Sequence, residues 1–344
     1  MSLPTRVIFL GSDAIAVPLL DWITTEGAKN FEVVAVFTQP DRPAGRGQKV
    51  QPNAIKTWAL ARALPVLQPE KLTPEIRGEL AAFRADLGLV MAYGHILRDE
   101  FIATPRLGML NLHTSVLPKY RGASPIQTAV ASGERETGVT LMRIVRQLDA
   151  GPVAAVERVS IDALDTALEV ESKLSVACVP LLRRALSRVA IGELQLMPQD
   201  EASATYCRKL QKDDGVLDFC APASTLAARI NGLFPWPGCA TEIDGQTIRI
   251  GLADVARGED ATGAGVDHPE NSLEASQASD VPGTVLGVDV HGLLVATSGG
   301  VLRLRRLQRS GGRMLAAGEF LRGFPIKAGT KLSSLPMPPL VSTR

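Results

Sequence analysis

Three polar side chains near the middle of the chain have the types and spacing needed for acyl chemistry. Asn111 and His113 lie two residues apart in GMLNLHTSVLP (Gly108–Pro118), and residues two apart in an extended chain point to the same side. Asp149 follows in RQLDAGP (Arg146–Pro152), a turn bounded by Gly and Pro. Acyl transfer needs a donor that holds an oxyanion and groups that move protons. The alternatives are a hydrogen-bonded histidine, an asparagine turn and an Asx turn at Asp149.

Common cofactor motifs do not accompany these residues. Gly11 ends the first apolar run, yet no GxGxxG follows it, and GxxxxGK[ST] does not occur in the chain. No His, Cys and carboxylate cluster has metal-ligand spacing, so we expect no metal. The cysteines lack CxxC spacing and are expected to be free thiols: Cys178, Cys207, Cys220 and Cys239.

The first half of the chain alternates short apolar runs with segments of helical length. The runs predict buried strands at Val7–Leu10, Val33–Phe37, Leu87–Met91 and Met109–Leu112, then a strand pair at Thr140–Val145 and Val153–Ile161. The helices are expected near Ala14–Thr24, Ala54–Ala63, Pro74–Ala85, Pro125–Ser132 and Ala163–Ile191. This alternation predicts an α/β fold with an open, mostly parallel sheet, whose ligands bind beyond the carboxyl ends of the strands.

The pattern changes after Ile191. Residues 192–212 lack periodicity and are predicted to be a linker between a catalytic domain, 1–191, and a smaller domain, 213–334. Short strands with turn residues predict an antiparallel β unit, built as a barrel. They are expected at Ala240–Ile243, Thr247–Ile250, Gly283–Val288, Gly292–Ala296 and Leu302–Leu307. Residues 252–281 are rich in Gly, Ala, Ser, Asp and Glu, and we interpret them as a disordered acidic insertion.

Composition is typical of a soluble globular protein. The chain has 344 residues, of which 45% are apolar and 21% charged, which allows two separate cores. No apolar run approaches the roughly 20 residues needed to cross a bilayer, and the stretch before Val7 is too short for a signal peptide. We therefore expect a cytoplasmic protein without membrane association.

The net charge of +1 hides an uneven distribution. Residues 301–344 contain nine basic side chains against Glu319 alone, whereas residues 252–281 contain seven acidic ones against Arg257. A polar loop, Thr38–Lys49, adds Arg42, Arg46 and Lys49. Basic loops and stripes suit a phosphate backbone. An ordinary flexible loop and a solvated strand face remain the alternatives.

Several segments taken together resemble the methionyl-tRNA formyltransferase family. In order along the chain they are VFTQPDRPAGRGQ (Val36–Gln48), VMAYGHIL (Val90–Leu97), LNLHTSVLPKYRGASPIQ (Leu110–Gln127), TGVTLMRIVRQLDAGP (Thr137–Pro152) and NGLFPWPGCATEIDGQ (Asn231–Gln246). The Asn-x-His pair and the downstream Asp are shared with other enzymes that use 10-formyltetrahydrofolate. The PDRPAGRG loop and the PWP segment are more specific to the enzymes that act on tRNA.

The resemblance implies a Rossmann-like formyltransferase domain joined to an OB-like C-terminal domain that binds tRNA. It implies a catalytic set of Asn111, His113 and Asp149. The folate-contact turn corresponds to Ser115, Val116, Leu117 and Pro118, where Val116 departs from the usual residue but stays apolar. The strand-end loop with Tyr93, Gly94 and Ile96 is expected to complete the folate site. The tRNA contacts are expected from Arg42, Arg46, Lys49, Arg303, Arg305 and Arg306.

The function implied by the resemblance is transfer of a formyl group from 10-formyltetrahydrofolate to methionine on initiator methionyl-tRNA, in translation initiation. The expected protein is a monomer. One alternative keeps the chemistry and changes the acceptor to a small amine or an amino sugar. A non-catalytic RNA-binding protein is disfavoured by intact Asn111, His113 and Asp149, and a dinucleotide oxidoreductase by the missing GxGxxG.

Overall fold

The chain divides into an N-terminal and a C-terminal unit. The computed structural model describes residues 3–44, 47, 49–190, 192–256 and 281–343. The N-terminal unit comprises Met1–Gly122, Thr137–Val159 and Glu171–Tyr206. The C-terminal unit comprises Ala123–Glu136, Ser160–Val170 and Cys207–Arg344, so two segments from the first half of the chain belong with the second half. The boundaries expected from the sequence, 1–191 and 213–334, are drawn differently from this division and stay a prediction.

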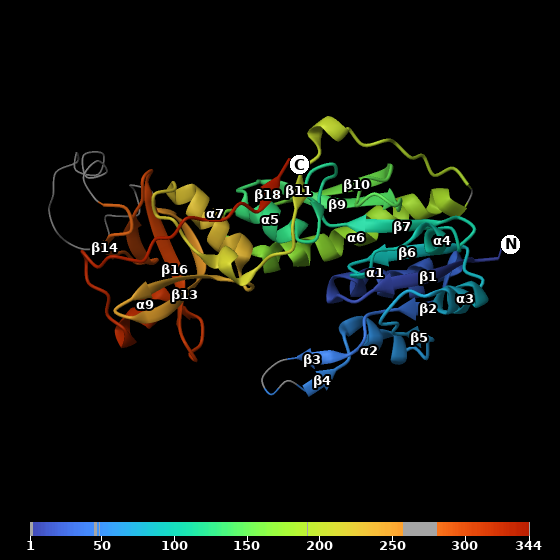
Figure 1. The fold of residues 1–344 in the computed structure, drawn as a ribbon, viewed down its shortest axis with the longest axis horizontal. Helices are drawn as coiled ribbons and strands as arrows, with labels where there is room; N and C mark the ends of the chain where they lie inside the picture. Colours follow the sequence, from blue (N-terminus) through green and yellow to red (C-terminus); the bar gives the residue numbers. More distant parts are fainter. Residues whose placement is uncertain (1–2, 45–46, 48, 191, 257–280, 344) are drawn as a thin grey trace. The chain divides into compact units, whose positions relative to one another are not determined.

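A seven-stranded sheet forms the centre of the N-terminal unit (Figure 1). In spatial order its strands are β10 (Val153–Ser160), β9 (Glu136–Arg143), β7 (Met109–His113), β6 (Leu87–Met91), β1 (Thr5–Gly11), β2 (Phe31–Phe37) and β5 (Val66–Leu67). The strands from β7 to β5 run parallel, and β9 pairs antiparallel with β7. The chain builds outward from β1 to β5 and then returns to the other side of β1 with β6. The sheet is therefore open and mostly parallel, as predicted, with its strand order reversing between β1 and β6.

Helices cover both faces of this sheet. Ile8 and Leu10 of β1 share a core with Leu80 and Phe101, whereas Met91 contacts Cys178 on the other face. The helical elements of the first half are η1 (Ala14–Ala16), α1 (Val17–Thr24), η2 (Glu26–Lys29), α2 (Ala54–Leu60), α3 (Pro74–Ala82), α4 (Asp99–Ile102), α5 (Pro125–Ala131) and α6 (Ala167–Ala190). Within the described residues, none of the helices combines the length and the apolar character needed to cross a membrane.

Helix starts follow local capping chemistry. Asn53 precedes α2 and accepts a hydrogen bond from the backbone N–H of Lys56 at 2.9 Å. Thr73 precedes α3 in the same role, and Pro74 occupies the first helical position. Short polar side chains at this position satisfy backbone N–H groups that the helix leaves unpaired, and proline there has no N–H to satisfy. These signals explain why the starts of α2 and α3 match the prediction.

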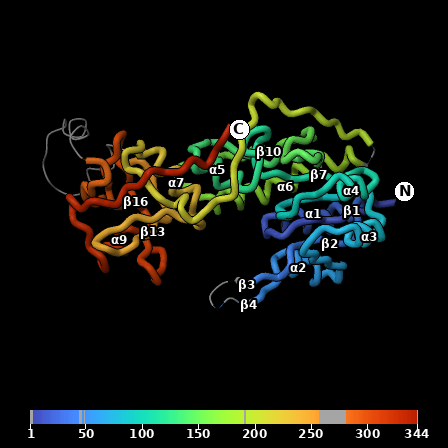
Figure 2. The backbone as a smooth tube through the Cα atoms, viewed as in Figure 1, coloured from blue at the N-terminus to red at the C-terminus, as the bar shows by residue number. Residues whose placement is uncertain are grey.

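The loop expected at Thr38–Lys49 is partly a hairpin. Strands β3 (Arg42–Ala44) and β4 (Lys49–Gln51) pair antiparallel, with Arg42 opposite Gln51. Figure 2 follows the chain into and out of this hairpin. The Pro and Gly content concealed it, because both residue types are depleted in strands. Arg46 lies outside the described residues.

An antiparallel sheet forms the C-terminal unit. Its strands run in the order β12 (Cys239–Ile243), β13 (Gln246–Ala256), β16 (Val301–Arg309), β15 (Leu293–Ala296) and β14 (Val285–Val288), with β17 (Leu315–Ala316) on β16. The expected antiparallel β unit is thus confirmed. Strand β13 extends into the segment expected to be a disordered insertion as far as Ala256. Residues 257–280 lie outside the described residues.

Two helices of this unit were missed by the sequence prediction, α7 (Ala223–Leu233) and α9 (Ala317–Gly323). The apolar residues of α7 recur at helical spacing and join the core of the unit: Ala223, Leu226, Ala227, Ile230 and Leu233. Helix α5 packs closely on α7, where a Cβ on Gly232 would lie 2.3 Å from the backbone nitrogen of Ala131. Only glycine allows this approach. The remaining short elements are β8 (Arg121–Gly122), η3 (Glu201–Ser203), β11 (Tyr206–Cys207), η4 (Lys212–Gly215) and β18 (Val341–Ser342).

Candidate active site

Strand β7 brings the first two candidate side chains to the carboxyl edge of the parallel sheet. Asn111 pairs with Val90 of β6 on one side and with Met142 of β9 on the other. His113 ends the strand and is buried, whereas Asn111 is half-buried. Among the described residues, the side-chain amide of Asn111 has no hydrogen-bond partner. An amide held on a rigid strand and left free is available to a ligand.

The imidazole of His113 lies between a carboxylate and a backbone carbonyl. Its Nε2 is 2.9 Å from the carbonyl oxygen of Tyr120. Because a carbonyl only accepts, the proton on this side belongs to Nε2. The Nδ1 atom faces Oδ2 of Asp149 at 3.6 Å. Both ring nitrogens are therefore directed by groups of the protein, and His113 and Asp149 form a pair between which a proton can move after a small adjustment.

Asp149 occupies a turn that presents its carboxylate toward β7. Its backbone has a φ of 48°, a left-handed conformation that Asp and Asn adopt more readily than most residues. Oδ2 accepts a hydrogen bond from the backbone N–H of Gly122 at 2.9 Å. Two residues later, a Cβ on Gly151 would lie 1.8 Å from the carbonyl oxygen of Arg143, so only glycine fits there. The turn is thereby held against the end of β9.

Hydrogen bonds of two buried hydroxyl groups, those of Ser115 and Thr140, hold the turn after His113. Ser115 is fully buried, and its hydroxyl donates to the carbonyl oxygen of Lys119 at 2.6 Å. Thr140 of β9 donates to the carbonyl oxygen of Ser115 at 2.7 Å and accepts from the N–H of Leu117 at 3.1 Å. Of the four residues predicted to contact folate, Val116 and Pro118 are the partly exposed ones. Ser115 and Leu117 hold the shape of the turn that presents them.

A second loop follows β6, the neighbour of β7. Its Tyr93 is buried, and burial raises the pKa of this phenol above its ordinary value. The side chain of Ile96 is 84% exposed, and Gly94 has a φ of 81°. Gln39, which follows β2, donates to the carbonyl oxygen of Tyr93 at 3.0 Å. The exposed side chain of Ile96 offers an apolar surface beside polar loop groups, the combination that ligand sites use.

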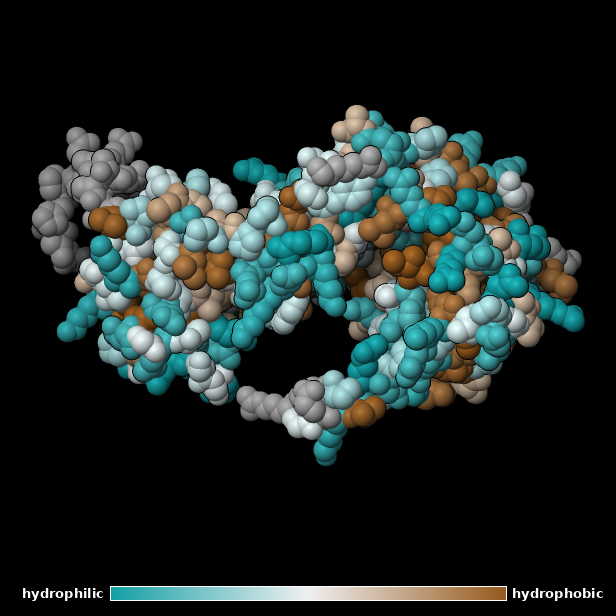
Figure 3. All heavy atoms as spheres, in the orientation of Figure 1, coloured by the Kyte–Doolittle hydropathy of each residue, from teal (hydrophilic) through white to brown (hydrophobic). Residues whose placement is uncertain are grey.

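The basic residues predicted to contact tRNA divide into two kinds. Arg42 and Lys49 are exposed on the β3–β4 hairpin, from which hydrophilic side chains project in Figure 3. Arg306 is also exposed. Arg303 is only 1% exposed. It pairs with Asp254 at 3.2 Å and with Asp289 at 2.8 Å.

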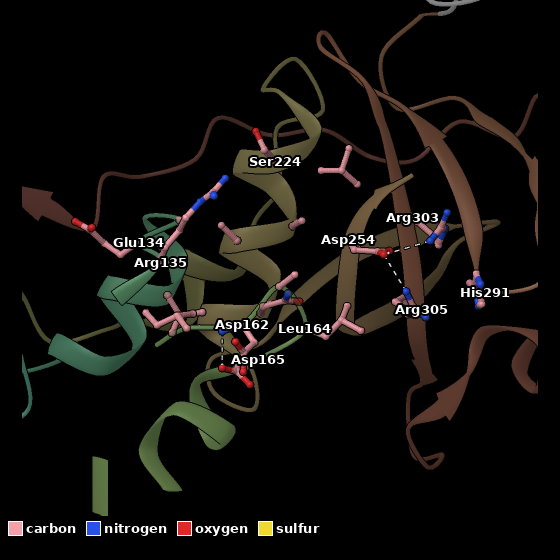
Figure 4. A pocket seen from close by; sticks show the side chains of 18 residues that line it. Glu134, Arg135, Asp162, Leu164, Asp165, Ser224, Asp254, His291, Arg303 and Arg305 are labelled. Atoms are coloured by element: carbon pink, nitrogen blue, oxygen red, sulfur yellow. Dashed lines mark hydrogen bonds and ion pairs between the residues drawn. The ribbon is translucent and has the colours of Figure 1, made fainter. Parts of the chain in front are cut away.

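The burial of Arg303 corrects its expected role. Its guanidinium is committed to carboxylates inside the C-terminal unit, so it is withdrawn from the predicted tRNA contacts. Arg305 shares Asp254 at 2.8 Å but stays 22% exposed. Figure 4 shows the carboxylate of Asp254 facing both arginines, with a dashed line to each. All three line a cavity of about 700 Å³ that also includes His291 and Ser224. The described residues include no group of three or more His, Cys, Asp or Glu that could hold a metal ion.

Two further residues, Arg121 and Gln199, belong to the hydrogen-bond network around Asp149 in the candidate active site. The sequence prediction assigned no role to either. Arg121 lies in the segment LNLHTSVLPKYRGASPIQ and is fully buried. Gln199 comes from the segment expected to be a linker, and its side chain donates to the carbonyl oxygen of Asp149 at 2.8 Å. Arg121 could have been suspected from its place after the folate-contact turn. Gln199 has no signal in the sequence, because its partners Asp149, Gly151 and Arg121 are 48 to 78 residues away along the chain.

Both halves of the chain match known protein families by sequence. Residues 5–186 match the family model described as formyl transferase, and residues 209–325 match the formyl transferase C-terminal domain. The chain is 39% identical over 332 residues to a methionyl-tRNA formyltransferase of Aromatoleum aromaticum, covering 96% of the chain and 98% of that relative. It is 40% identical over 330 residues to the enzyme of the same name from Thiobacillus denitrificans, covering 96% of the chain and all of the relative.

Solved structures share the fold at lower identity. An N-formyltransferase from Helicobacter canadensis, in complex with folinic acid and dTDP-3-aminofucose, has a TM-score of 0.61 at 18% identity. That match covers 88% of this chain and 99% of the other. HypX from Aquifex aeolicus, in complex with tetrahydrofolic acid, has a TM-score of 0.57 at 16% identity, covering 96% of this chain and 51% of the other. At these identities the likeness concerns the fold.

Proposed function

The chain belongs to the formyl transferase family, and we propose that it transfers the formyl group of 10-formyltetrahydrofolate to the α-amine of methionine on initiator methionyl-tRNA. The observation that carries this proposal is the similarity to methionyl-tRNA formyltransferases, at 39–40% identity over 96% of the chain. It spans both units, including the hairpin and the C-terminal sheet. A shared formyl-transfer domain alone would leave the acceptor open.

The reaction needs little activation of its nucleophile. A free α-amine has a pKa of about 8, and the neighbouring ester lowers it, so much of the amine is neutral near pH 7. The amine nitrogen attacks the formyl carbon, and a tetrahedral intermediate with an oxyanion forms. The bond from the formyl carbon to N10 of the folate then breaks. One proton moves from the attacking nitrogen to N10, so formyl-methionyl-tRNA and tetrahydrofolate leave without a net change in protons.

Asn111 is the proposed oxyanion donor. Its amide is free of partners among the described residues, and β7 fixes its direction between two neighbouring strands. A donor that is already oriented stabilises developing charge without reorganising during the reaction.

His113 and Asp149 are the proposed proton-transfer pair. The Nε2 of His113 is occupied by the carbonyl of Tyr120, so its Nδ1 side faces the reaction with Asp149. Within the described residues, Oδ1 of Asp149 accepts no hydrogen bond. This free oxygen can take the proton from the attacking nitrogen and return it to N10, directly or through water. This assignment places His113 in proton transfer and leaves the oxyanion to Asn111.

The donor and the acceptor approach from different elements in this proposal. Folate lies between the loop of Tyr93, Gly94 and Ile96 and the turn of Ser115–Pro118, with apolar side chains packing on the pterin. The tRNA backbone meets Arg42 and Lys49 on the hairpin, together with Arg46. The protein acts as a monomer in the cytoplasm.

The basic strand β16 is the second proposed tRNA contact. Arg306 provides an exposed guanidinium, and Arg305 a partly exposed one that also pairs with Asp254. Contacts from both units would read the phosphate backbone rather than the bases, so they supply affinity and position more than sequence specificity.

The direct test supplies the purified protein with 10-formyltetrahydrofolate and compares acceptors. We expect formylation of methionyl-initiator tRNA and no product with amino sugars or small amines. Omitting the donor is the control for background. Formylation of an amino sugar at a rate equal to that of the charged tRNA would support the small-acceptor alternative and reject the tRNA assignment.

A further inference from the structure

The segment that connects the two halves of the chain is hydrogen-bonded to both turns of the candidate active site. Met197 and Val153 exchange backbone hydrogen bonds of 2.8 Å. Thr205 donates from its N–H to the carbonyl oxygen of Pro118, and its hydroxyl accepts from the N–H of Tyr120 at 2.9 Å. The segment between these points therefore lies along the site within the N-terminal unit. It is a wall of the site as well as a connection.

Gln199 lies at the centre of this wall with its amide fully used. Its Nε2 donates to the carbonyl oxygens of Asp149 at 2.8 Å and Gly151 at 2.7 Å. Its Oε1 accepts from Nε and Nη2 of Arg121 at 3.1 and 2.8 Å. A primary amide has two donor hydrogens and an oxygen with two lone pairs. Both donor hydrogens and both lone pairs of Gln199 are used. The two donor hydrogens hold the turn that carries Asp149.

Arg121 fixes the other end of the amide. Its guanidinium is fully buried and also forms a bidentate pair with Glu201, at 3.0 and 2.7 Å. Such fork geometry sets direction as well as energy. The next residue, Gly122, donates its N–H to Oδ2 of Asp149. The backbone and the carboxylate of Asp149 are thus tied, by two routes, to the same short stretch of chain.

We propose that Gln199 is a positioning residue for Asp149, held in orientation by Arg121, so that the connecting segment sets the carboxylate at its working distance from His113. The inference rests on the proposed role of Asp149 in formyl transfer. Asp149 has a left-handed backbone, which is disfavoured for a residue with a side chain unless its surroundings impose it. The two donors of Gln199 are part of what imposes it.

The decisive variant is Gln199→Glu. It keeps an oxygen for Arg121 but replaces the two donor hydrogens with a carboxylate oxygen that repels both carbonyls. A displacement of about 1 Å can reduce turnover about 100-fold. We expect kcat to fall between about 10-fold and 100-fold, while KM for the tRNA and for the donor changes less than about threefold. Gln195→Glu is the matched control, because Gln195 is exposed in the same segment and forms no hydrogen bond with the described residues.

A double-mutant cycle separates positioning from general damage. Once Asp149 is Asn, adding Gln199→Glu should reduce the residual turnover by less than about threefold, because residues that act through one another are not additive. An equal loss in both backgrounds would overturn the proposal, as would native turnover in Gln199→Glu or a change confined to KM.

The same set of variants distinguishes the proposed catalytic role of Asp149 from the positioning role of Gln199. Native turnover in Asp149→Asn would overturn the proposed role of Asp149 and the positioning role with it. A large loss in Asp149→Asn with native turnover in Gln199→Glu would reject the positioning role alone. Thermal unfolding of each variant checks folding. If Gln199→Glu does not fold, Gln199→Met replaces it in the cycle with Asp149→Asn. Methionine has a similar length and no hydrogen-bonding group at its end.

Discussion

Each unit contains a cluster of buried or partly buried polar side chains, and the two clusters differ in how their charges are balanced. In the C-terminal unit, Arg303 contacts Asp254 and Asp289, and Asp254 also contacts Arg305. Two cations and two anions balance each other there. In the N-terminal unit, Asn111 is uncommitted and Asp149 stands 3.6 Å from His113.

The difference between the two clusters indicates which polar groups are candidates for catalysis. Leaving a buried donor or acceptor unpaired costs about 1–3 kcal/mol, and a stable fold tolerates that best where a ligand supplies the partner. The arginine cluster of β16 is balanced in charge, and its cations and anions lie 2.8–3.2 Å apart. Charge balance, rather than residue type, therefore separates this cluster from the candidate active site, where the amide of Asn111 has no partner among the described residues.

The strongest test of the comparison is Asp149→Asn. Asn still accepts from the N–H of Gly122 but cannot take up a proton, so kcat should fall about 1000-fold or more. The free energy of unfolding should change by less than about 1 kcal/mol. Asp244→Asn is the matched control, because Asp244 also has a left-handed backbone, with a φ of 49°, and lies in an exposed turn. Single-turnover formylation and urea unfolding measure the two effects, and a loss of stability without loss of turnover would reverse the contrast.

The opposite result is expected for Arg303→Met. It leaves Asp289 without its cation and Asp254 with Arg305 alone, and removing one partner of a buried pair costs about 3–5 kcal/mol. We expect unfolding of the C-terminal unit to become easier by about 3 kcal/mol, measured by urea titration. Arg306→Met, on the same strand but exposed, should change stability by about 0.5 kcal/mol or less. Equal stability of the two variants would contradict the structural role of Arg303.

The same substitution, Asn to Ala, should have opposite effects at Asn111 in the candidate active site and at Asn231 in the C-terminal unit. Asn111→Ala removes the proposed oxyanion donor and should lower kcat about 100-fold with little change in stability. Asn231→Ala should do the reverse, because its buried amide donates to and accepts from the backbone of Ala253 at 3.0 and 2.9 Å. Its loss should cost about 2 kcal/mol. Similar kcat values for the two folded variants would remove the case for Asn111.

The sequence predicts most of the N-terminal sheet because its strands are continuous apolar runs. Leu87–Met91 matches β6 at both ends, and the period of two places Asn111 and His113 on one side. Helix α7 was missed although its apolar spacing was legible, because small residues such as Ala223 and Ala227 give a weak pattern. The amide network of Gln199 depends on contacts across 48 to 78 residues, which no local pattern encodes.

Arg303 shows the same limit for charge. On the sequence it belongs to a basic stripe, and nothing in that stripe distinguishes it from Arg306. Its burial follows from strand pairing, which sets Asp254 of β13 directly opposite Arg303 of β16. Opposite charges that face each other across strands attract, and the loop after β14 brings in Asp289. Register is a property of the whole sheet, so charge counting overestimated the exposed basic surface.

Asp214 extends the comparison to pH. This buried carboxylate accepts from Arg208 and from the N–H of Gln211, and although burial opposes the shift, these bonds hold its pKa below the usual value. A lowered folded pKa contributes stability that is full above the unfolded pKa of 3.8 and is lost as the pH falls through the folded pKa. Asp214→Asn should therefore be destabilised by about 2 kcal/mol at pH 7. The difference from the native protein should shrink below pH 4, and a constant difference in urea unfolding across this range would contradict the assignment.

The smallest expected effect concerns the exposed arginines. Arg42→Gln and Arg306→Gln each remove one proposed phosphate contact, so the log–log slope of tRNA affinity against salt should become shallower by about 1. Turnover at saturating tRNA should stay native, because neither residue lies at the reacting carbon. Arg305 is the informative intermediate, since Asp254 already holds part of its charge and a shared guanidinium releases fewer counterions from the nucleic acid. Arg305→Gln should therefore change the slope by less than Arg306→Gln. If Arg305→Gln changed the salt slope by a full unit, tRNA would draw Arg305 away from Asp254. The charge-balanced cluster would then open when the substrate binds.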